Sequence, residues 1–255
     1  MPLLIKNGRI ITATDDYNTD IYCADETITR IEPSIDPRTL PPETELIDAA
    51  GKYVFPGFID PHVHIHLPFM GTHARDDYES ASRAALVGGT TSIIEMVCPA
   101  PDQEPMDAFN QWSTRATDLA GVDYSFHMGV VRFDDLAREQ LRSIVKDHGI
   151  ASFKVFLAYK GALDISDEDL FGLLTLAKQL GVITTAHCEN ATAIDAMQKK
   201  LLGEGKTGPR WHEPSRPVRV EAEGVHHLAT FAELTGAHVY AVHTSCAPAI
   251  DAARA

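Results

Sequence analysis

Apolar runs of strand length alternate with helical stretches along most of this chain of 255 residues. The six runs are Phe58–His64, Thr90–Met96, Tyr124–Val131, Ser152–Tyr159, Val182–His187 and His238–His243. Helical periodicity is clearest over Asp134–His148 and over Ser166–Leu180, and the second stretch opens on a capping-box pattern and stops at Gly181. Alternating strands and helices favour parallel strands, so the sequence predicts an α/β fold with a barrel-like sheet.

The first 53 residues follow a different pattern. Short β-rich runs surround an Asn7-Gly8 pair, which predicts a hairpin turn, and four prolines between residues 33 and 42 mark a loop. We therefore expect a small N-terminal β-sandwich module over residues 1–53 and a barrel domain over residues 54–255. A complete (β/α)8 TIM-like barrel takes about 250 residues, so the second domain is expected to be an incomplete barrel of about six units. The chain is accordingly interpreted as a fragment.

Four of the strand-length runs carry residues of metal-ligand type near their ends. His62 and His64 are two residues apart, so on a strand both imidazoles project to the same side and can share one metal ion. Lys154, His187 and His243 each come from a later run. Because the carboxyl ends of parallel strands meet at one end of a barrel, this pattern predicts a metal-dependent hydrolase. Imidazole ligands suit zinc, and also cobalt, manganese or nickel.

Composition narrows the class of partner and the compartment. The formal net charge of −14 argues against nucleic acid and against anionic membrane surfaces, because both require a basic face. No run of about 18 apolar residues predicts a membrane span, and the first residues lack the plan of a signal peptide. Four widely spaced cysteines fit reduced thiols, so a cytoplasmic location is predicted. Cys188 and Cys246 lie near the proposed ligands, which leaves open a contribution of thiolate to metal binding.

Three stretches carry a resemblance to a known family. Val54–His64, which reads VFPGFIDPHVH, resembles the first-strand signature of the amidohydrolase superfamily. Ser152–Lys160, which reads SFKVFLAYK, is similar to the lysine motif of its cyclic amidases, the hydantoinases and dihydropyrimidinases. Gly205–Pro209 together with His212–Pro217 also resembles that branch. The resemblance covers nearly the whole chain.

The resemblance implies two divalent metal ions, most naturally Zn²⁺. His62 and His64 would bind the more buried ion, His187 and His243 would bind the more exposed ion, and Lys154 would bridge the two as N6-carboxylysine, a carbamate formed with carbon dioxide. The chemistry requires such a group, because two metal ions about 3.5–4 Å apart need a bridging anion. An unmodified lysine, with an ordinary pKa of about 10.4, is a cation and cannot bridge.

The resemblance also implies a reaction and a substrate pocket. The reaction is the hydrolytic opening of a cyclic amide, such as a dihydropyrimidine, a 5-substituted hydantoin or a cyclic imide, by a hydroxide shared between the metal ions. Tyr159 would hydrogen-bond the substrate carbonyl or the oxyanion formed from it. Phe69, Phe156 and Leu163 would line an apolar pocket for the substituent of the ring. Plain core packing is the alternative for Phe156.

Further expectations concern the proton carrier, assembly and competing functions. In the family, an aspartate after the eighth strand takes the proton of the water. That aspartate would follow Ala255 in this protein, and Asp60 is not expected to replace it. Residues 1–255 alone are therefore expected to be poorly active or inactive. A homotetramer is implied as well. The alternatives are an allantoinase or dihydroorotase type of cyclic amidase, or a non-catalytic scaffold protein, although scaffold relatives lose metal ligands that this chain keeps. Seven other histidines are interpreted as surface, helix or loop residues: His73, His127, His148, His212, His226, His227 and His238.

Overall fold

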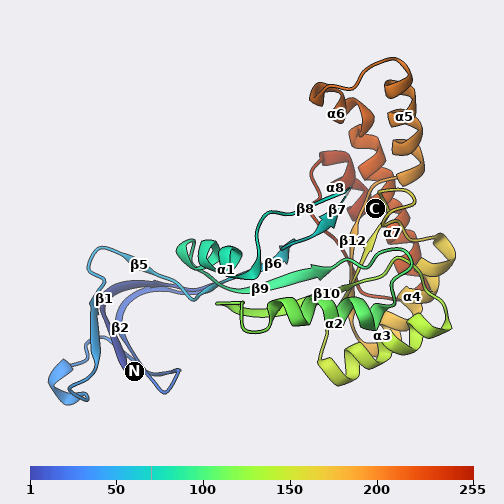
Figure 1. Ribbon diagram of the computed structural model, residues 1–255. Helices are drawn as coiled ribbons and strands as arrows, with labels where there is room; N and C mark the ends of the chain where they lie inside the picture. The colour runs from blue at the N-terminus through green and yellow to red at the C-terminus, as the bar shows by residue number, and fades with distance from the viewer. Residues whose placement is uncertain (70) are drawn as a thin grey trace. The chain divides into compact units, whose positions relative to one another are not determined.

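A computed structural model describes residues 1–69 and 71–255, which form two compact units (Figure 1). Unit 1 comprises residues 1–59 and 89–91, and unit 2 comprises residues 60–88 and 92–255. Two strands of the larger sheet therefore begin in unit 1 and continue in unit 2. The expected domain boundary after residue 53 stays a prediction.

Unit 1 contains a mixed sheet in the order β3-β2-β1-β4, with β5 also paired to β1. Its strands are β1 (Leu3–Ile11), β2 (Asp16–Ala24), β3 (Thr27–Glu32), β4 (Glu45–Asp48) and β5 (Tyr53–Val54). β1 pairs antiparallel with β2 and parallel with β4 and β5. A short 3-10 helix, Pro37–Thr39, lies in the predicted proline-rich loop. The module expected as a sandwich is thus one five-stranded sheet around a small core of Leu4, Tyr22 and Ile35.

The hairpin predicted at Asn7-Gly8 is wrong, because β1 runs straight through this pair. The register of β1 against β2 shifts between Ile5 and Gly8, which marks a β-bulge. Asn7 does adopt the left-handed conformation of a turn residue (φ 61°), but its N–H donates to Asp20 Oδ1 at 2.9 Å. The buried Asp20 carboxylate also accepts from Lys6 Nζ at 2.6 Å. The hydrogen bond to Asp20, which is distant in the chain, therefore accompanies a β-bulge at Asn7 in place of the predicted turn.

Unit 2 carries most of a parallel sheet in the order β13-β12-β11-β10-β9-β6 (Figure 1). Its strands are β6 (Phe58–Val63), β9 (Thr90–Val97), β10 (Asp123–Gly129), β11 (Ser152–Phe156), β12 (Ile183–His187) and β13 (Val239–Ala241). The neighbouring pairs from β9 to β13 are all parallel. The expected α/β class and the six successive strands of an incomplete barrel are confirmed. A small antiparallel pair, β7 (Pro68–Phe69) and β8 (Thr72–His73), follows β6.

Eight helices connect or follow these strands in the described part of the chain. They are α1 (Tyr78–Val87), α2 (Pro105–Ala116), α3 (Asp135–His148), α4 (Asp167–Leu180), α5 (Ala191–Gly203), α6 (His212–Ser215), α7 (Val218–Thr235) and α8 (Ala247–Arg254), with a 3-10 turn at Pro209–Trp211. α4 begins and ends as predicted, because Ser166 Oγ accepts from Asp169 N at 3.1 Å and Gly181 closes the helix with φ 70°. Within residues 1–69 and 71–255, none of the helices is both long and apolar enough to cross a bilayer.

The core of unit 2 lies where the helices meet the sheet, and β11 is buried along its whole length. Lys154 lies in register with Gly129 on β10 and with Thr185 on β12. Gly129 leaves no room for a side chain, because an added Cβ would collide with the carbonyl oxygen of Val97. This tight packing places the ammonium-bearing side chain of Lys154 in the middle of the sheet.

Candidate metal centre

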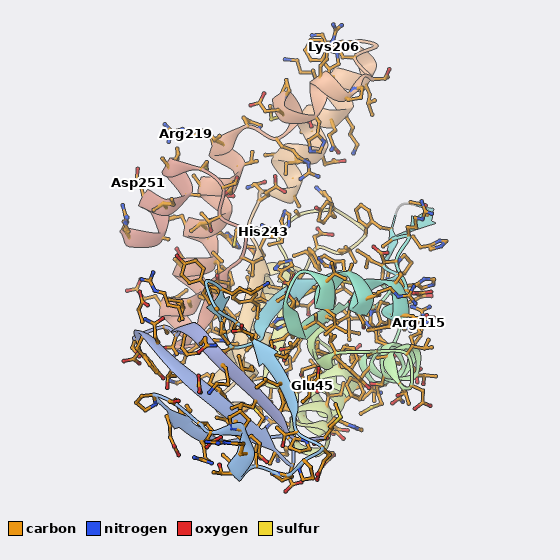
Figure 2. All side chains as sticks on the ribbon, turned by 90° about the vertical axis from the view of Figure 1, so that its left-hand side faces the viewer. Glu45, Arg115, Lys206, Arg219, His243 and Asp251 are labelled. Carbon is orange, nitrogen blue, oxygen red and sulfur yellow. The ribbon has the colours of Figure 1, made fainter. Side chains whose placement is uncertain are left out.

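All five residues predicted to bind metal lie in unit 2, on four of the parallel strands or directly after them. His62 lies near the end of β6 and His64 directly follows that strand. Lys154 lies in the middle of β11, His187 is the last residue of β12, and His243 follows β13 by two residues. Figure 2 labels His243 apart from Arg219 and Asp251, which lie on helices α7 and α8. The strand ends therefore converge as the sequence predicts.

The four imidazole rings form a continuous series. The ring centroids are 5.4 Å apart for His62 and His64, 5.2 Å apart for His62 and His243, and 4.6 Å apart for His187 and His243. His243 has a positive φ of 40°, a conformation that is strained for a side-chain-bearing residue and is often found at functional sites. By their place in the chain, His62 and His64 form a first pair from β6, and His187 and His243 form a second pair from the ends of β12 and β13. His62 and His243 bring the two pairs together.

Lys154 is fully buried beside these rings, with 0% of its surface exposed. Its Nζ finds no hydrogen-bond partner among the residues that the structure describes, and it lies 4.8 Å from the ring centroid of Phe156. Burial lowers the pKa of Lys154 to about 8. More of this amine is therefore neutral near pH 7 than of an exposed lysine, and only the neutral amine can attack carbon dioxide.

His62 and His64 are held in the neutral form, which is the form that binds metal ions. Burial, followed by the nearby Lys154 charge, lowers the pKa of His62 to about 3 and that of His64 to about 4. The buried Nδ1 of His64 has no hydrogen-bond partner in the described part of the chain. Within residues 1–69 and 71–255, no three His, Cys, Asp or Glu side chains are arranged to hold a metal ion by themselves. The donor set thus fits two metal ions only if Lys154 supplies an anionic ligand between the histidine pairs.

Glu95 lies behind the first pair of histidines and was not foreseen from the sequence. This residue of β9 has 0% of its surface exposed, and its two carboxylate oxygens accept from the N–H of Ile65 at 3.0 and 2.8 Å. Ile65 directly follows His64 in the chain. Burial raises the pKa of Glu95 to about 8. A carboxyl group that resists ionisation therefore anchors the loop after β6.

Glu95 makes the stability of the metal-free protein depend on pH. Its pKa is about 8 in the folded state against an ordinary 4.5, so the folded chain keeps a proton that the unfolded chain releases, and stability falls as pH rises toward 8. The lowered pKa values of His62 and His64 have the opposite effect, but only below their ordinary value of 6.5. The lowered pKa of Lys154, about 8, adds a gain in stability as pH approaches 8, and Glu95→Gln retains this gain. The change in Tm between pH 6.5 and 8 is therefore expected to be more negative in the wild type than in Glu95→Gln, as measured by thermal unfolding.

The exposed Glu204 supplies the control for this measurement. Its carboxylate pairs with Lys206 at 2.6 Å, an interaction that lowers its pKa, so Glu204→Gln is expected to keep the slope of the wild type above pH 6.5. An equal slope in the wild type and in Glu95→Gln would contradict the assignment of the titration to Glu95.

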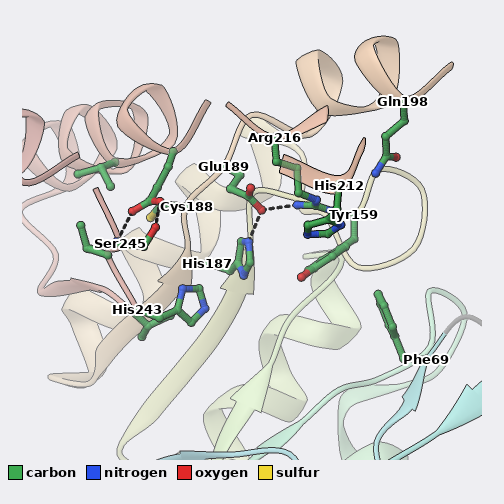
Figure 3. A pocket seen from close by; sticks show the side chains of 14 residues that line it. Phe69, Tyr159, His187, Cys188, Glu189, Gln198, His212, Arg216, His243 and Ser245 are labelled. Atoms are coloured by element: carbon green, nitrogen blue, oxygen red, sulfur yellow. Dashed lines mark hydrogen bonds and ion pairs between the residues drawn. The ribbon is translucent and has the colours of Figure 1, made fainter. Parts of the chain in front are cut away.

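A cavity of about 450 Å³ opens beside the second pair of histidines (Figure 3). This volume is in the range of small-molecule sites. Phe69, Tyr159, His187 and His243 line it. The Tyr159 ring centroid lies 5.2 Å from that of Phe69 and 5.2 Å from that of His187, and its hydroxyl end points toward His187 (Figure 3). Tyr159 also has a positive φ of 64°, which fixes an unusual direction for this side chain.

The two other apolar residues expected in the pocket lie deeper. Phe156 is a buried member of the core, with its ring centroid 5.9 Å from that of Tyr159 and 6.0 Å from that of His187. Leu163 packs against the same core. Among the described residues that line the cavity, neither Phe156 nor Leu163 is present. Phe156 therefore packs in the core beside the site, which agrees with the core-packing alternative. Cys188 lines the cavity, and burial raises the pKa of its thiol to about 12, which disfavours the thiolate as a metal ligand.

Sequence reasoning missed a charged pair at the rim of the cavity. Glu189 Oε2 lies 2.6 Å from His187 Nε2 and 2.5 Å from an Arg216 guanidinium nitrogen (Figure 3). Glu189 follows His187 by two residues, which is a local signal that could have found it. Arg216 is 27 residues further along the chain, and only the fold brings it to the site.

The interpretation of His127 as a surface, helix or loop residue is wrong. It lies on β10, is 7% exposed, and its Nε2 hydrogen-bonds the carbonyl oxygen of Pro61 at 2.9 Å. Its Nδ1 hydrogen-bonds the Ser152 hydroxyl. His127 therefore connects the segment directly before His62 to the start of β11, and it has no contact with the cavity described above.

Comparisons with known proteins agree with this geometry. A family model described as "Amidohydrolase family" matches residues 53–253. The chain is 42% identical over 252 residues to a D-hydantoinase of Geobacillus stearothermophilus, covering 98% of this chain and 52% of the relative. It is 35% identical to a dihydropyrimidinase of Dictyostelium discoideum, covering 98% of this chain and 49% of the relative.

A solved structure gives the same result at the level of the fold. The D-hydantoinase (dihydropyrimidinase) from Thermus sp. superimposes with a TM-score of 0.95 at 57% identity, covering 99% of this chain and 54% of that one. The chain thus spans about half the length of the relatives that it matches. With a matching family model over most of its residues and a parallel sheet whose strand ends gather four histidines and a buried lysine, this chain belongs to the amidohydrolase family.

Proposed function

We propose that the protein is a metal-dependent hydrolase that opens a cyclic amide ring, with a dihydropyrimidine, a 5-substituted hydantoin or a cyclic imide as substrate. The observation that carries the proposal is the buried Lys154 amine, which lacks a partner in the described residues and lies beside four imidazoles. Such an amine is destabilised as a cation and is suited to become a carbamate. The names of the relatives, D-hydantoinase and dihydropyrimidinase, support the substrate class.

The proposed metal centre divides the ligands into two sets. His62 and His64 hold one divalent ion, most naturally Zn²⁺, and His187 and His243 hold the other. The neutral Lys154 amine would add to carbon dioxide, forming an N–C bond and releasing a proton, and the resulting carbamate would supply the anionic ligand that the two ions need. When bound, the ions supply Lewis acidity and lower the pKa of water.

The remaining side chains are proposed to bind and orient the substrate. The Tyr159 hydroxyl donates a hydrogen bond to the carbonyl oxygen of the ring and continues to donate as that oxygen gains negative charge. Phe69, whose ring centroid lies 5.2 Å from that of Tyr159, provides an apolar wall for the ring substituent. Phe156 supports both Tyr159 and His187 from the core.

Tyr159→Phe is expected to lower kcat by about 10²–10³-fold, the usual cost of removing one oxyanion donor, while KM changes little. The ring of the variant keeps its packing, so only the hydrogen bond is lost. Steady-state kinetics on the complete gene product measure this effect. Tyr124→Phe is the matched control, because Tyr124 lies on β10 with 39% of its surface exposed. An unchanged kcat in Tyr159→Phe would remove Tyr159 from the mechanism.

A panel of ring substrates tests the proposed function directly. The panel contains dihydrouracil, 5-substituted hydantoins and a cyclic imide, together with allantoin and dihydroorotate. Ring opening is monitored as a decrease in ultraviolet absorbance. Turnover of one of the first three classes is the expected result. Turnover of dihydroorotate or allantoin alone would favour the sister type of cyclic amidase. The absence of any turnover with two metal ions bound would favour the non-catalytic scaffold.

Location and assembly complete the proposal. All four cysteines are free, which supports a reducing, cytoplasmic environment. A homotetramer is proposed from the family resemblance alone. Sedimentation of the protein as expressed from its gene tests the assembly.

A further inference from the structure

We infer that Glu189 and Arg216 are positioning residues, which fix His187 in one tautomer and couple it to Tyr159. The inference rests on the proposed function, because it takes His187 as a metal ligand and Tyr159 as a substrate-binding residue. Neither Glu189 nor Arg216 is needed as a ligand in the proposed centre. Their contacts nevertheless reach both groups.

The contact between Glu189 and His187 determines which ring nitrogen remains available. His187 Nε2 lies 2.6 Å from Glu189 Oε2, and both side chains are only 14% exposed. An ionised carboxylate only accepts hydrogen bonds, so Nε2 carries the hydrogen. In the neutral ring the lone pair is then on Nδ1, and Nδ1 is the nitrogen that can bind a metal ion. A carboxylate behind a histidine ligand commonly has this orienting role.

Arg216 holds the carboxylate in place. One of its guanidinium nitrogens lies 2.5 Å from the same Oε2 of Glu189, and the Arg216 side chain is also 14% exposed. A largely buried carboxylate without a counter-charge would be costly, and the guanidinium offsets that cost.

The same guanidinium reaches the substrate-binding tyrosine. The Arg216 guanidinium carbon lies 5.2 Å from the ring centroid of Tyr159, within the distance of a cation–π contact. The Tyr159 ring in turn lies 5.2 Å from the ring of His187. The contacts therefore close a circuit from His187 through Glu189 and Arg216 to Tyr159 and back to His187 (Figure 3). A shift of one member displaces the others, so the metal ligand and the phenol are positioned together.

The tautomer of His187 is measurable without any turnover. Long-range proton–nitrogen NMR on metal-free protein with ¹⁵N-labelled histidine distinguishes a protonated Nε2 from a protonated Nδ1, and His187→Gln assigns the signal. We expect Nε2 to be protonated in the wild type. Glu189→Leu is expected to give a mixture of tautomers. Glu189→Gln keeps an oxygen that accepts from Nε2, so it is expected to retain the wild-type tautomer.

Zinc affinity provides the second readout. In Glu189→Leu, one of the two zinc ions is expected to bind about 10–100-fold more weakly, the usual cost of losing an orienting partner, while the other ion is unaffected. Competition with a chromogenic chelator measures both constants. Glu204→Leu is the matched control on the surface, where Glu204 pairs with Lys206. Because Arg216 acts through Glu189, Arg216→Gln combined with Glu189→Leu should bind zinc no more weakly than Glu189→Leu alone.

Three outcomes would overturn the inference: a protonated Nδ1 in the wild type, an unchanged tautomer and unchanged zinc affinities in Glu189→Leu, or additive losses in the double variant. The first needs no variant of Glu189 or Arg216, so misfolding of those variants does not prevent the test. A wild-type protein that binds two zinc ions with a protonated His187 Nε2, yet opens no cyclic amide, would refute the proposed function and support the inference.

Discussion

Lys154→Ala is expected to bind fewer than two metal ions per chain and to lose about 10³-fold or more in kcat/KM on a cyclic amide, since metal-ion catalysis contributes several kcal/mol. The variant removes the one group that can become an anion between the two histidine pairs. Without it, two bound cations would lack the bridging anion that offsets their repulsion. The amine is fully buried and lacks a partner among the described residues, so its removal breaks no existing hydrogen bond.

Elemental mass spectrometry measures the metal content after growth with zinc and bicarbonate, and native mass spectrometry detects the added mass of one carbon dioxide. Lys160→Ala is the matched control, because Lys160 is exposed and its Nζ contacts only the Thr192 hydroxyl at 3.2 Å. A Lys154→Ala protein with two bound metal ions and normal turnover would exclude the bridging role.

A small carboxylic acid should partly restore the Lys154→Ala protein. The truncated side chain leaves a space beside Phe156, whose ring lies 4.8 Å from the lysine nitrogen in the wild type. Propionate can enter this space and present two oxygens, as the carbamate would. Recovery of metal content with propionate, but not with the uncharged propionamide, would identify the missing feature as an anion. Equal recovery with both would point to simple filling of the cavity.

The sequence was sufficient for the site wherever a local pattern decides the outcome. Each of the four histidines lies in the last residues of a strand or shortly after it, and parallel strands bring their carboxyl ends together whatever the details of packing. They are His62, His64, His187 and His243. The same holds for Lys154, whose apolar neighbours in the chain require burial. These residues could be predicted because strand direction alone brings them together.

Tertiary contacts account for what the sequence could not predict. Asn7 has the turn preference expected of an Asn-Gly pair, but the buried Asp20 carboxylate captures its N–H and extends the strand. His127 gives no local signal, because its role depends on a carbonyl oxygen 66 residues away. Glu189 and Arg216 likewise meet only in the folded chain. Hydrogen bonds between residues that are far apart in the chain leave no trace in the strand period of two residues or the helix period of 3.6 residues.

His64→Asn and His243→Asn are each expected to remove one metal ion, but not the same one. His64 is half-buried behind a loop that Glu95 anchors, whereas His243 is exposed at the rim of the cavity. In the wild type, a chelator should therefore remove zinc in two phases, first from the pair His187 and His243. His243→Asn should retain only the slow phase and His64→Asn only the fast phase.

Both variants are expected to lose about 10³-fold in kcat/KM, because a single ion cannot supply the shared Lewis acidity. His226→Asn is the control, since His226 is an exposed residue of α7. Loss of both ions from each variant, or of neither, would contradict the assignment of one histidine pair to each ion. Each variant is expected to keep one metal ion, so the metal content does not tell the two variants apart. The rate at which the chelator removes the remaining ion does, because the ligands of the two ions differ in exposure.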